Sequence, residues 1–154
     1  MSSMATIRDF LAQRRIAIVG VSRNERELSR TLLRTLRDRG CEVFAVNPAM
    51  DGVDGIPCYS SLREIPSQVD GVLVMASPVV TDQVVRDCAD LHIQRVWMYR
   101  AGGQGAVSPA AVEFCQEHGI AVVPGECPYM FLEGESWFHG LHGFLRKITG
   151  LYPA

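Results

Sequence analysis

The chain has 154 residues, a formal net charge of −2, 47% hydrophobic residues and 21% charged residues. This length and composition are typical of one globular domain that buries a core without covalent cross-links. The nearly neutral charge argues against nucleic acid or an anionic membrane as a partner.

The first third of the chain alternates between helical and strand patterns. Residues 5–11 suit a short amphipathic helix, and the apolar run 16–19 suits a buried strand. A second helix is predicted to end at Gly40, a typical C-terminal cap, because four leucines before it recur at helical spacing: Leu28, Leu32, Leu33 and Leu36. The run 41–46 predicts the second strand, which Asn47-Pro48 ends.

The middle of the chain continues the alternation after a turn-rich loop at 51–57. Residues 58–60 suit a short edge strand, and Ser61 with Glu64 has the spacing of a capping box for one helical turn. Residues 70–76 are apolar on both faces, as a strand inside a parallel sheet requires. The next helix carries one apolar stripe made of Val80, Val84, Cys88 and Leu91.

The last third adds a strand at 94–99, a glycine-rich loop, and a helix that begins at Ser108-Pro109 and ends at Gly119. A strand at 120–123 follows, and the spacing of apolar residues in the tail predicts a docked helix over 136–149. Short links between strands and helices predict a three-layer, Rossmann-like α/β fold with a doubly wound, mainly parallel sheet.

Ligands bind such sheets at the carboxyl ends of the strands, near the point where the strand order reverses. The segments that follow the strands, "GVSRNERE", "NPAM", "ASPVV" and "YRAGGQG", are therefore expected along one edge. We predict a single domain over 1–154, with its core at about 14–128.

The turn after the first strand has the layout of a phosphate-binding turn. Gly20 allows the backbone to approach a ligand without a Cβ clash, and Ser22 and Asn24 can donate hydrogen bonds. The following helix presents its N-terminus, and three arginines could pair with phosphate oxygens: Arg23, Arg26 and Arg30. An ordinary strand-to-helix turn with solvated arginines would show the same residues. On the phosphate hypothesis, a Gly20→Val protein is expected to fold and to lose its ligand.

The end of the second strand disfavours NAD. NAD-dependent dehydrogenases place a carboxylate there for the adenosine ribose, whereas this chain has the neutral Asn47, followed by Pro48. Asn47 would tolerate a phosphate on the ribose. The turn also lacks the second and third glycines of a dinucleotide fingerprint.

Together, "GVSRNERE", "VNPAM", "MASPVV" and "PGECP" resemble the CoA-binding domain family, which includes the N-terminal domain of the succinyl-CoA synthetase alpha subunit and small free-standing bacterial proteins. The resemblance covers about residues 14–128 and implies coenzyme A or an acyl-CoA as ligand. The contacts that it implies are Gly20, Val21, Ser22, Arg23, Asn24, Glu25, Arg26, Ser29 and Arg30 for the phosphates; Val46, Asn47 and Pro48 for adenosine; and Ala76, Ser77, Pro78, Val80, Tyr99 and Arg100 for the base or the pantetheine arm.

Three departures from the synthetase limit what the resemblance implies. The synthetase has a lysine where this chain has Met50, so the contact with the 3′-phosphate passes to an arginine or is missing. Its phosphorylated histidine lies in a second domain, for which 154 residues leave no room. The glycine-rich loop 101–105 replaces a shorter turn, and is either a flexible connector or a segment that closes over a ligand.

Other candidate chemistry is sparse. Five widely spaced cysteines without a Cys-x-x-Cys pair disfavour disulfides and structural zinc, and Cys127 lies after the last strand, where it is either a structural residue or one that meets a thioester. Two pairs at i, i+3, His139 with His142 and Cys115 with His118, have no third ligand, so no metal site is expected. Without an apolar signal core or a long apolar run, a cytoplasmic protein is expected.

The hypothesis from sequence is thus a binder of coenzyme A or acyl-CoA that does not catalyse a reaction alone. The alternatives are a small NAD(P)-dependent oxidoreductase and an interaction module. In the latter, the aromatic tail docks a synthetase-like partner or a second copy of the chain.

Overall fold

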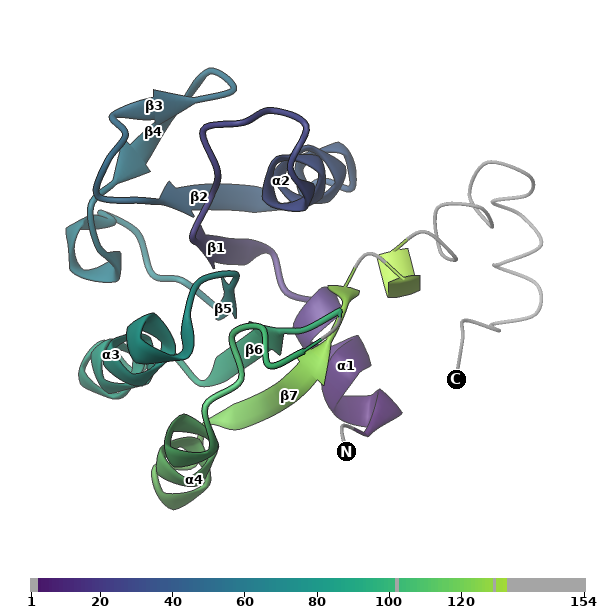
Figure 1. Ribbon diagram of the computed structural model, residues 1–154, viewed down its shortest axis with the longest axis vertical. Coiled ribbons are helices and arrows are strands. Elements are labelled where there is room, and N and C mark those ends of the chain that lie inside the picture. The colour runs from purple at the N-terminus through teal and green to yellow at the C-terminus, as the bar shows by residue number, and fades with distance from the viewer. Residues whose placement is uncertain (1–2, 102, 129, 133–154) are drawn as a thin grey trace.

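The computed structural model describes residues 3–101, 103–128 and 130–132. These residues form a seven-stranded sheet with the order β3-β4-β2-β1-β5-β6-β7 (Figure 1). All neighbouring strands are parallel except β3 and β4, which confirms the predicted doubly wound, mainly parallel sheet. The strands are β1 (Arg15–Val19), β2 (Glu42–Val46), β3 (Gly52–Val53), β4 (Ile56–Tyr59), β5 (Gly71–Val74), β6 (Arg95–Tyr99) and β7 (Ala121–Glu126).

Helices cover both faces of the sheet. They are α1 (Met4–Leu11), α2 (Leu28–Asp38), α3 (Pro78–Asp90) and α4 (Pro109–Glu117), with the short 3₁₀ helix η1 (Leu62–Glu64). In β1, Ile16 and Ile18 pack with residues of α1 and α2, whereas Ala17 and Val19 pack with residues of α3 and α4. Because successive side chains of a strand point to opposite faces, one buried apolar run supplies both layers of the core.

The predicted helix ends are confirmed at two places. The Ser108 hydroxyl accepts a hydrogen bond from the Ala111 N–H at 3.2 Å, and Pro109 is the first residue of α4. After α2, Gly40 has a positive φ and the Cys41 N–H donates to the Leu36 carbonyl at 3.0 Å. Both arrangements satisfy backbone groups that a helix end leaves without a partner.

The segment between β2 and β5 differs from the prediction. It contains a β3–β4 hairpin whose turn, Asp54-Gly55, has positive φ at both residues, as a tight type I′ turn requires. The strand predicted at 58–60 therefore begins at Ile56 instead, and it is not the edge strand, because β3 pairs with its outer side. The predicted capping box is not formed: the Ser61 hydroxyl makes no capping hydrogen bond, and the Glu64 carboxylate accepts from the Ser60 hydroxyl at 2.6 Å.

The predicted tail helix 136–149, with His139 and His142, lies outside the described residues. Close before it, the buried Leu132 belongs to the apolar cluster under α1 and α2, and Phe131 meets the Trp97 ring edge-on at a centroid distance of 6.0 Å. Among the helices that the structure describes, none is long and apolar enough to cross a membrane.

Candidate functional site

The strand order reverses at β1, which lies between β2 and β5. From β1 the chain proceeds outward to β2 and β4, and then returns to β5 and continues to β6 and β7 on the other side. The loops that follow β1 and β5 therefore leave the same edge of the sheet toward opposite faces, and the crevice between them is where such folds bind ligands.

Gly20 lies at this point of reversal, directly after β1. Its N–H donates to the Val46 carbonyl at 2.9 Å, and its φ is +98°. A Cβ at this position would lie 2.4 Å from the Met75 carbonyl oxygen and 3.2 Å from the Ala76 Cβ. The glycine is thus required by the packing of β1 against the end of β5. A Gly20→Val protein is therefore expected to be destabilised, and not only to lose its ligand.

The loop after β1 is held together by its own polar groups. The Ser22 N–H donates to the buried Ser29 hydroxyl at 2.9 Å, and the Asn24 N–H donates to the Ser22 hydroxyl at 3.0 Å. The Asn24 side chain in turn accepts from the Arg26 N–H at 3.0 Å. Ser22, Asn24 and Ser29, all predicted as ligand contacts, therefore also fix the path of the loop. Val21 is fully buried under α2, backbone included, and its carbonyl accepts a hydrogen bond from Asn47.

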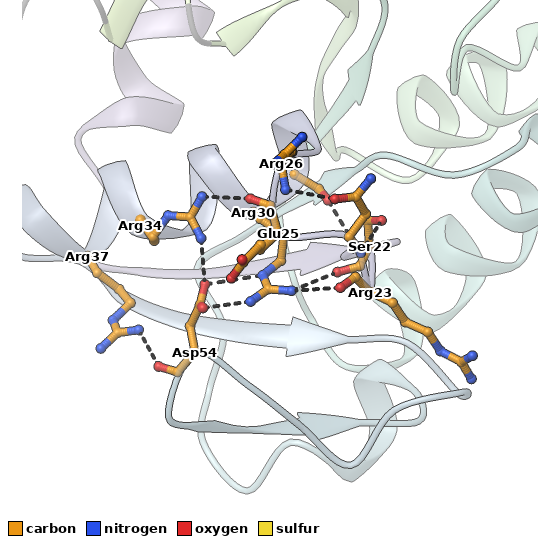
Figure 2. A network of polar contacts seen from close by, with 10 residues as sticks. Ser22, Arg23, Glu25, Arg26, Arg30, Arg34, Arg37 and Asp54 are labelled. Carbon is orange, nitrogen blue, oxygen red and sulfur yellow. Dashed lines mark hydrogen bonds and ion pairs between the residues drawn. The ribbon is translucent and has the colours of Figure 1, made fainter.

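Arg30 is the centre of a network that anchors this loop to the β3–β4 hairpin (Figure 2). Its guanidinium binds the Asp54 carboxylate with two hydrogen bonds, at 2.6 and 3.2 Å. Its Nη1 also donates to the carbonyls of Ser22 and Arg23, at 3.3 and 3.2 Å. This differs from the expectation that Arg30 offers its charge to a phosphate, because the guanidinium is nearly buried and already paired.

Two further arginines of α2 bind the same turn. Arg34 donates to the Asp54 carboxylate at 3.2 Å and to the Glu25 carbonyl at 2.9 Å, and Arg37 donates to the Asp54 carbonyl at 2.8 Å. The hydrogen bond from Arg30, reinforced by the charges of both Arg30 and Arg34, lowers the pKa of Asp54 below its ordinary range. Sequence reasoning missed Asp54, although Asp-Gly between two short apolar runs is a hairpin signal that could have located it.

The other two arginines of the turn, Arg23 and Arg26, are exposed. Figure 2 shows their side chains pointing away from Asp54 and away from each other. The Arg23 Nη2 donates to the Ala49 carbonyl at 3.0 Å, so its guanidinium lies at the loop that follows β2.

Asn47 joins the loops that follow β1 and β2. Its side-chain amide donates to the Val21 carbonyl at 2.7 Å and accepts from the Ala49 N–H at 2.8 Å. Val46 is buried in the layer under α3, whereas Pro48 is exposed at the edge of the sheet. The first carboxylate after β2 is that of Asp51, next to β3. The end of β2 itself therefore presents neutral and apolar groups, as predicted.

Across the crevice, Ala76 and Ser77 lead into α3, whose first residue is Pro78. The exposed Ser77 is the N-cap, and its hydroxyl makes no capping hydrogen bond. Val79 and Val80, in the first turn, are 77% and 38% exposed. This wall therefore combines a helix N-terminus with apolar side chains open to solvent, a combination suited to an anionic group joined to an apolar arm.

Tyr99 and Arg100 end β6 on the same edge of the sheet. Burial, and next to it the charge of the nearby Cys127, raises the pKa of the Tyr99 phenol. The glycine-rich loop folds back onto this strand end, because the Ala106 N–H donates to the Tyr99 carbonyl at 2.8 Å. The buried Thr81 hydroxyl of α3 donates to the Ala106 carbonyl at 2.7 Å. The C-terminal part of the loop is thus anchored to α3.

The described residues form no cluster of three metal-ligating side chains. Cys115 is fully buried, whereas His118 is exposed and stacks on the Phe114 ring at 3.9 Å, so this predicted pair points in different directions. None of the five cysteines forms a disulfide, and Cys127 is half-buried.

The comparison with known families agrees with this site. A family model described as a CoA binding domain matches residues 14–133. The chain belongs to the CoA-binding domain family. The match contains the loops after β1, β2, β5 and β6, and so spans every described element of the crevice.

Relatives of this CoA-binding domain occur within larger enzymes and as small proteins. The present chain is 27% identical to an ADP-forming acetate–CoA ligase I from Archaeoglobus fulgidus over 118 residues. These residues are 73% of this chain but only 17% of the ligase. The chain is 29% identical to the uncharacterized protein YneT from Bacillus subtilis over 126 residues, 81% of this chain and 90% of that protein. A solved structure of a hypothetical protein from Pyrococcus horikoshii aligns with a TM-score of 0.77 at 25% identity, covering 86% of this chain and 93% of that one.

Proposed function

We propose that this CoA-binding domain binds coenzyme A, free or acylated, in the crevice between the carboxyl ends of β1 and β5. The observation that carries the proposal is the match of the family model to residues 14–133, which include both walls of the crevice. The topology supports it independently, because the strand order reverses at this point.

The groups along the crevice fit the parts of coenzyme A in order. The pyrophosphate meets the loop 20–24 where it leads into α2, because the exposed Arg26 and the N-terminus of α2 favour negative charge there. The adenosine lies over Asn47 and Pro48 at the end of β2. The pantetheine arm runs along the exposed Val79 and Val80 toward Tyr99, beside which Cys127 lies.

We further propose that the isolated chain binds its ligand without turning it over. The two described histidines, His92 and His118, lie in the turns that precede β6 and β7, at the opposite edge of the sheet from the crevice. Cys127 therefore has no histidine base from the described part of the chain beside it. In this role the domain presents an acyl-CoA, in the cytoplasm, to a synthetase-like partner or to a second copy of itself; the ligase relatives support the first of these partners.

Isothermal titration calorimetry should show tighter binding of CoA than of NAD or NADP. A ribose-binding carboxylate is missing at the end of β2, so NAD loses a contact worth about tenfold or more in affinity. The missing second and third glycines of the dinucleotide fingerprint disfavour NAD and NADP alike. Acetyl-CoA should bind about as well as CoA, because the acyl end lies beyond the anchored phosphates. Equal or better binding of NAD or NADP would favour the oxidoreductase hypothesis and would refute the CoA proposal.

A further inference from the structure

We propose that Arg23 binds the 3′-phosphate of the CoA ribose and so makes the site selective for CoA over its 3′-dephospho form. This inference rests on the proposed function and assigns a specificity determinant within that site. It begins from the contact between Arg23 Nη2 and the Ala49 carbonyl, which places a guanidinium from the β1 loop at the end of β2.

The loop after β2 supplies no cation of its own. Both ends of the Asn47 amide are hydrogen-bonded, to Val21 and to Ala49. Pro48 has no N–H, and Met50 packs against the apolar cluster under α2. A phosphate on the adenosine ribose needs a positive partner, because otherwise it loses its hydration without replacement. That partner must therefore come from a neighbouring element.

The other arginines near this loop are committed or point elsewhere. Arg30, Arg34 and Arg37 all bind the Asp54 turn. The side chain of Arg26 extends to the other side of the β1 loop (Figure 2). Among the described arginines of the β1 loop and α2, Arg23 is therefore the one whose side chain reaches the β2 loop.

Arg23 is also held both at its backbone and at the tip of its side chain. Its backbone carbonyl accepts a hydrogen bond from Arg30 Nη1 at 3.2 Å, and its tip is bound to Ala49. A guanidinium has five N–H donors, and the described bond to Ala49 engages Nη2, so a planar fork of donors remains for phosphate oxygens. An arginine oriented in advance loses less freedom on binding than a solvated one, which favours a specific contact.

Calorimetric titration of CoA and 3′-dephospho-CoA into the wild type and an Arg23→Met variant tests the proposal. The wild type should bind CoA about tenfold or more tightly than dephospho-CoA, as a charge-assisted bidentate contact implies. Arg23→Met should weaken CoA binding by that factor and leave dephospho-CoA binding within about twofold. Arg23→Lys, which keeps the charge but loses the fork, should fall between them. Because Arg23 is exposed, both variants are expected to fold, and thermal denaturation checks this.

Arg26→Met is the matched control, since it removes an exposed arginine of the same loop whose side chain points elsewhere. It should reduce the affinities for CoA and dephospho-CoA equally, and by less than Arg23→Met reduces the affinity for CoA. Equal losses for CoA and dephospho-CoA in Arg23→Met, or no preference for CoA in the wild type, would overturn the assignment while leaving CoA binding intact. A wild type that binds neither ligand would instead refute the proposed function itself.

Discussion

Replacing Gly20 by alanine should lower the free energy of unfolding by roughly 3 kcal/mol, the sum of a left-handed backbone and an overpacked contact. The φ of +98° costs any residue with a Cβ, and the new Cβ would lie 2.4 Å from the Met75 carbonyl oxygen. Because this oxygen belongs to the backbone directly after β5, the clash is relieved only if the ends of β1 and β5 move apart. Urea denaturation followed by circular dichroism measures the loss.

Gly40→Ala separates the two causes. Gly40 has nearly the same φ, +94°, but no atom lies within 4 Å of the position that its Cβ would take. This variant should lose only about 1–2 kcal/mol, the backbone term. Equal losses in the two variants would show that the contact with Met75 costs nothing, and would return Gly20 to the role of a ligand-approach residue alone.

An Asp54→Asn variant should lose roughly 3 kcal/mol at pH 7, near the lower end of the cost of leaving a buried charge without its partner. Arg30 stays buried, with a side chain only 9% exposed, and loses the carboxylate that binds it with two hydrogen bonds. Asparagine keeps the shape of aspartate and suits the positive φ at this position, so the hairpin turn itself should survive. CoA affinity should fall as well, because Arg30 also holds two carbonyls of the β1 loop.

The stabilisation by Asp54 should depend on pH in a definite direction. Because the pKa of Asp54 is lowered in the folded state, its stabilisation is complete above the ordinary aspartate pKa, about 3.9. It is lost as the pH falls through the lower folded pKa. The difference in unfolding free energy between wild type and Asp54→Asn should therefore be full at pH 7 and shrink below about pH 4. A difference that stays constant from pH 7 to pH 3 would contradict the assigned charge pairing.

Asp90→Asn serves as a control for nonspecific charge effects. Asp90 pairs with Arg63 at 2.6 Å, but its side chain is 62% exposed. Exposed ion pairs contribute little to stability, so this variant should unfold close to the wild type. A loss as large as that of Asp54→Asn would mean that burial is not what distinguishes the Arg30–Asp54 pair.

The fold could be predicted because its strands are continuous apolar runs between clear turn signals. Residues 16–19 and 70–76 are apolar on both faces, which already indicates an inner parallel sheet, and Ser108-Pro109 and Gly40 mark helix ends by local chemistry alone. The β3–β4 hairpin could not be delimited in this way. Its apolar runs are two to four residues long, and its register depends on the Asp54-Gly55 turn.

The location of the candidate site could be predicted from the sequence. Which of its residues contact the ligand and which hold the loop in place could not. Arg23, Arg26 and Arg30 look alike in sequence, because each is an arginine beside the first turn. Their roles diverge only through Asp54, 24 residues after Arg30, which the fold brings against α2. Likewise, Gly20 suggested a ligand contact, whereas the atom nearest to the position of a Cβ there is the carbonyl oxygen of Met75, the residue directly after β5.

The most direct test of CoA binding at the carboxyl edge is a titration of the ¹⁵N-labelled chain with CoA, observed through its backbone amide signals. The largest shifts should fall on residues 20–24 and on Val79 and Val80. The amides around the polar hollow at the opposite edge, which includes Ala12 and Gly40, should stay unchanged. Shifts concentrated at that opposite edge, or the absence of any shift at saturating CoA, would contradict the account.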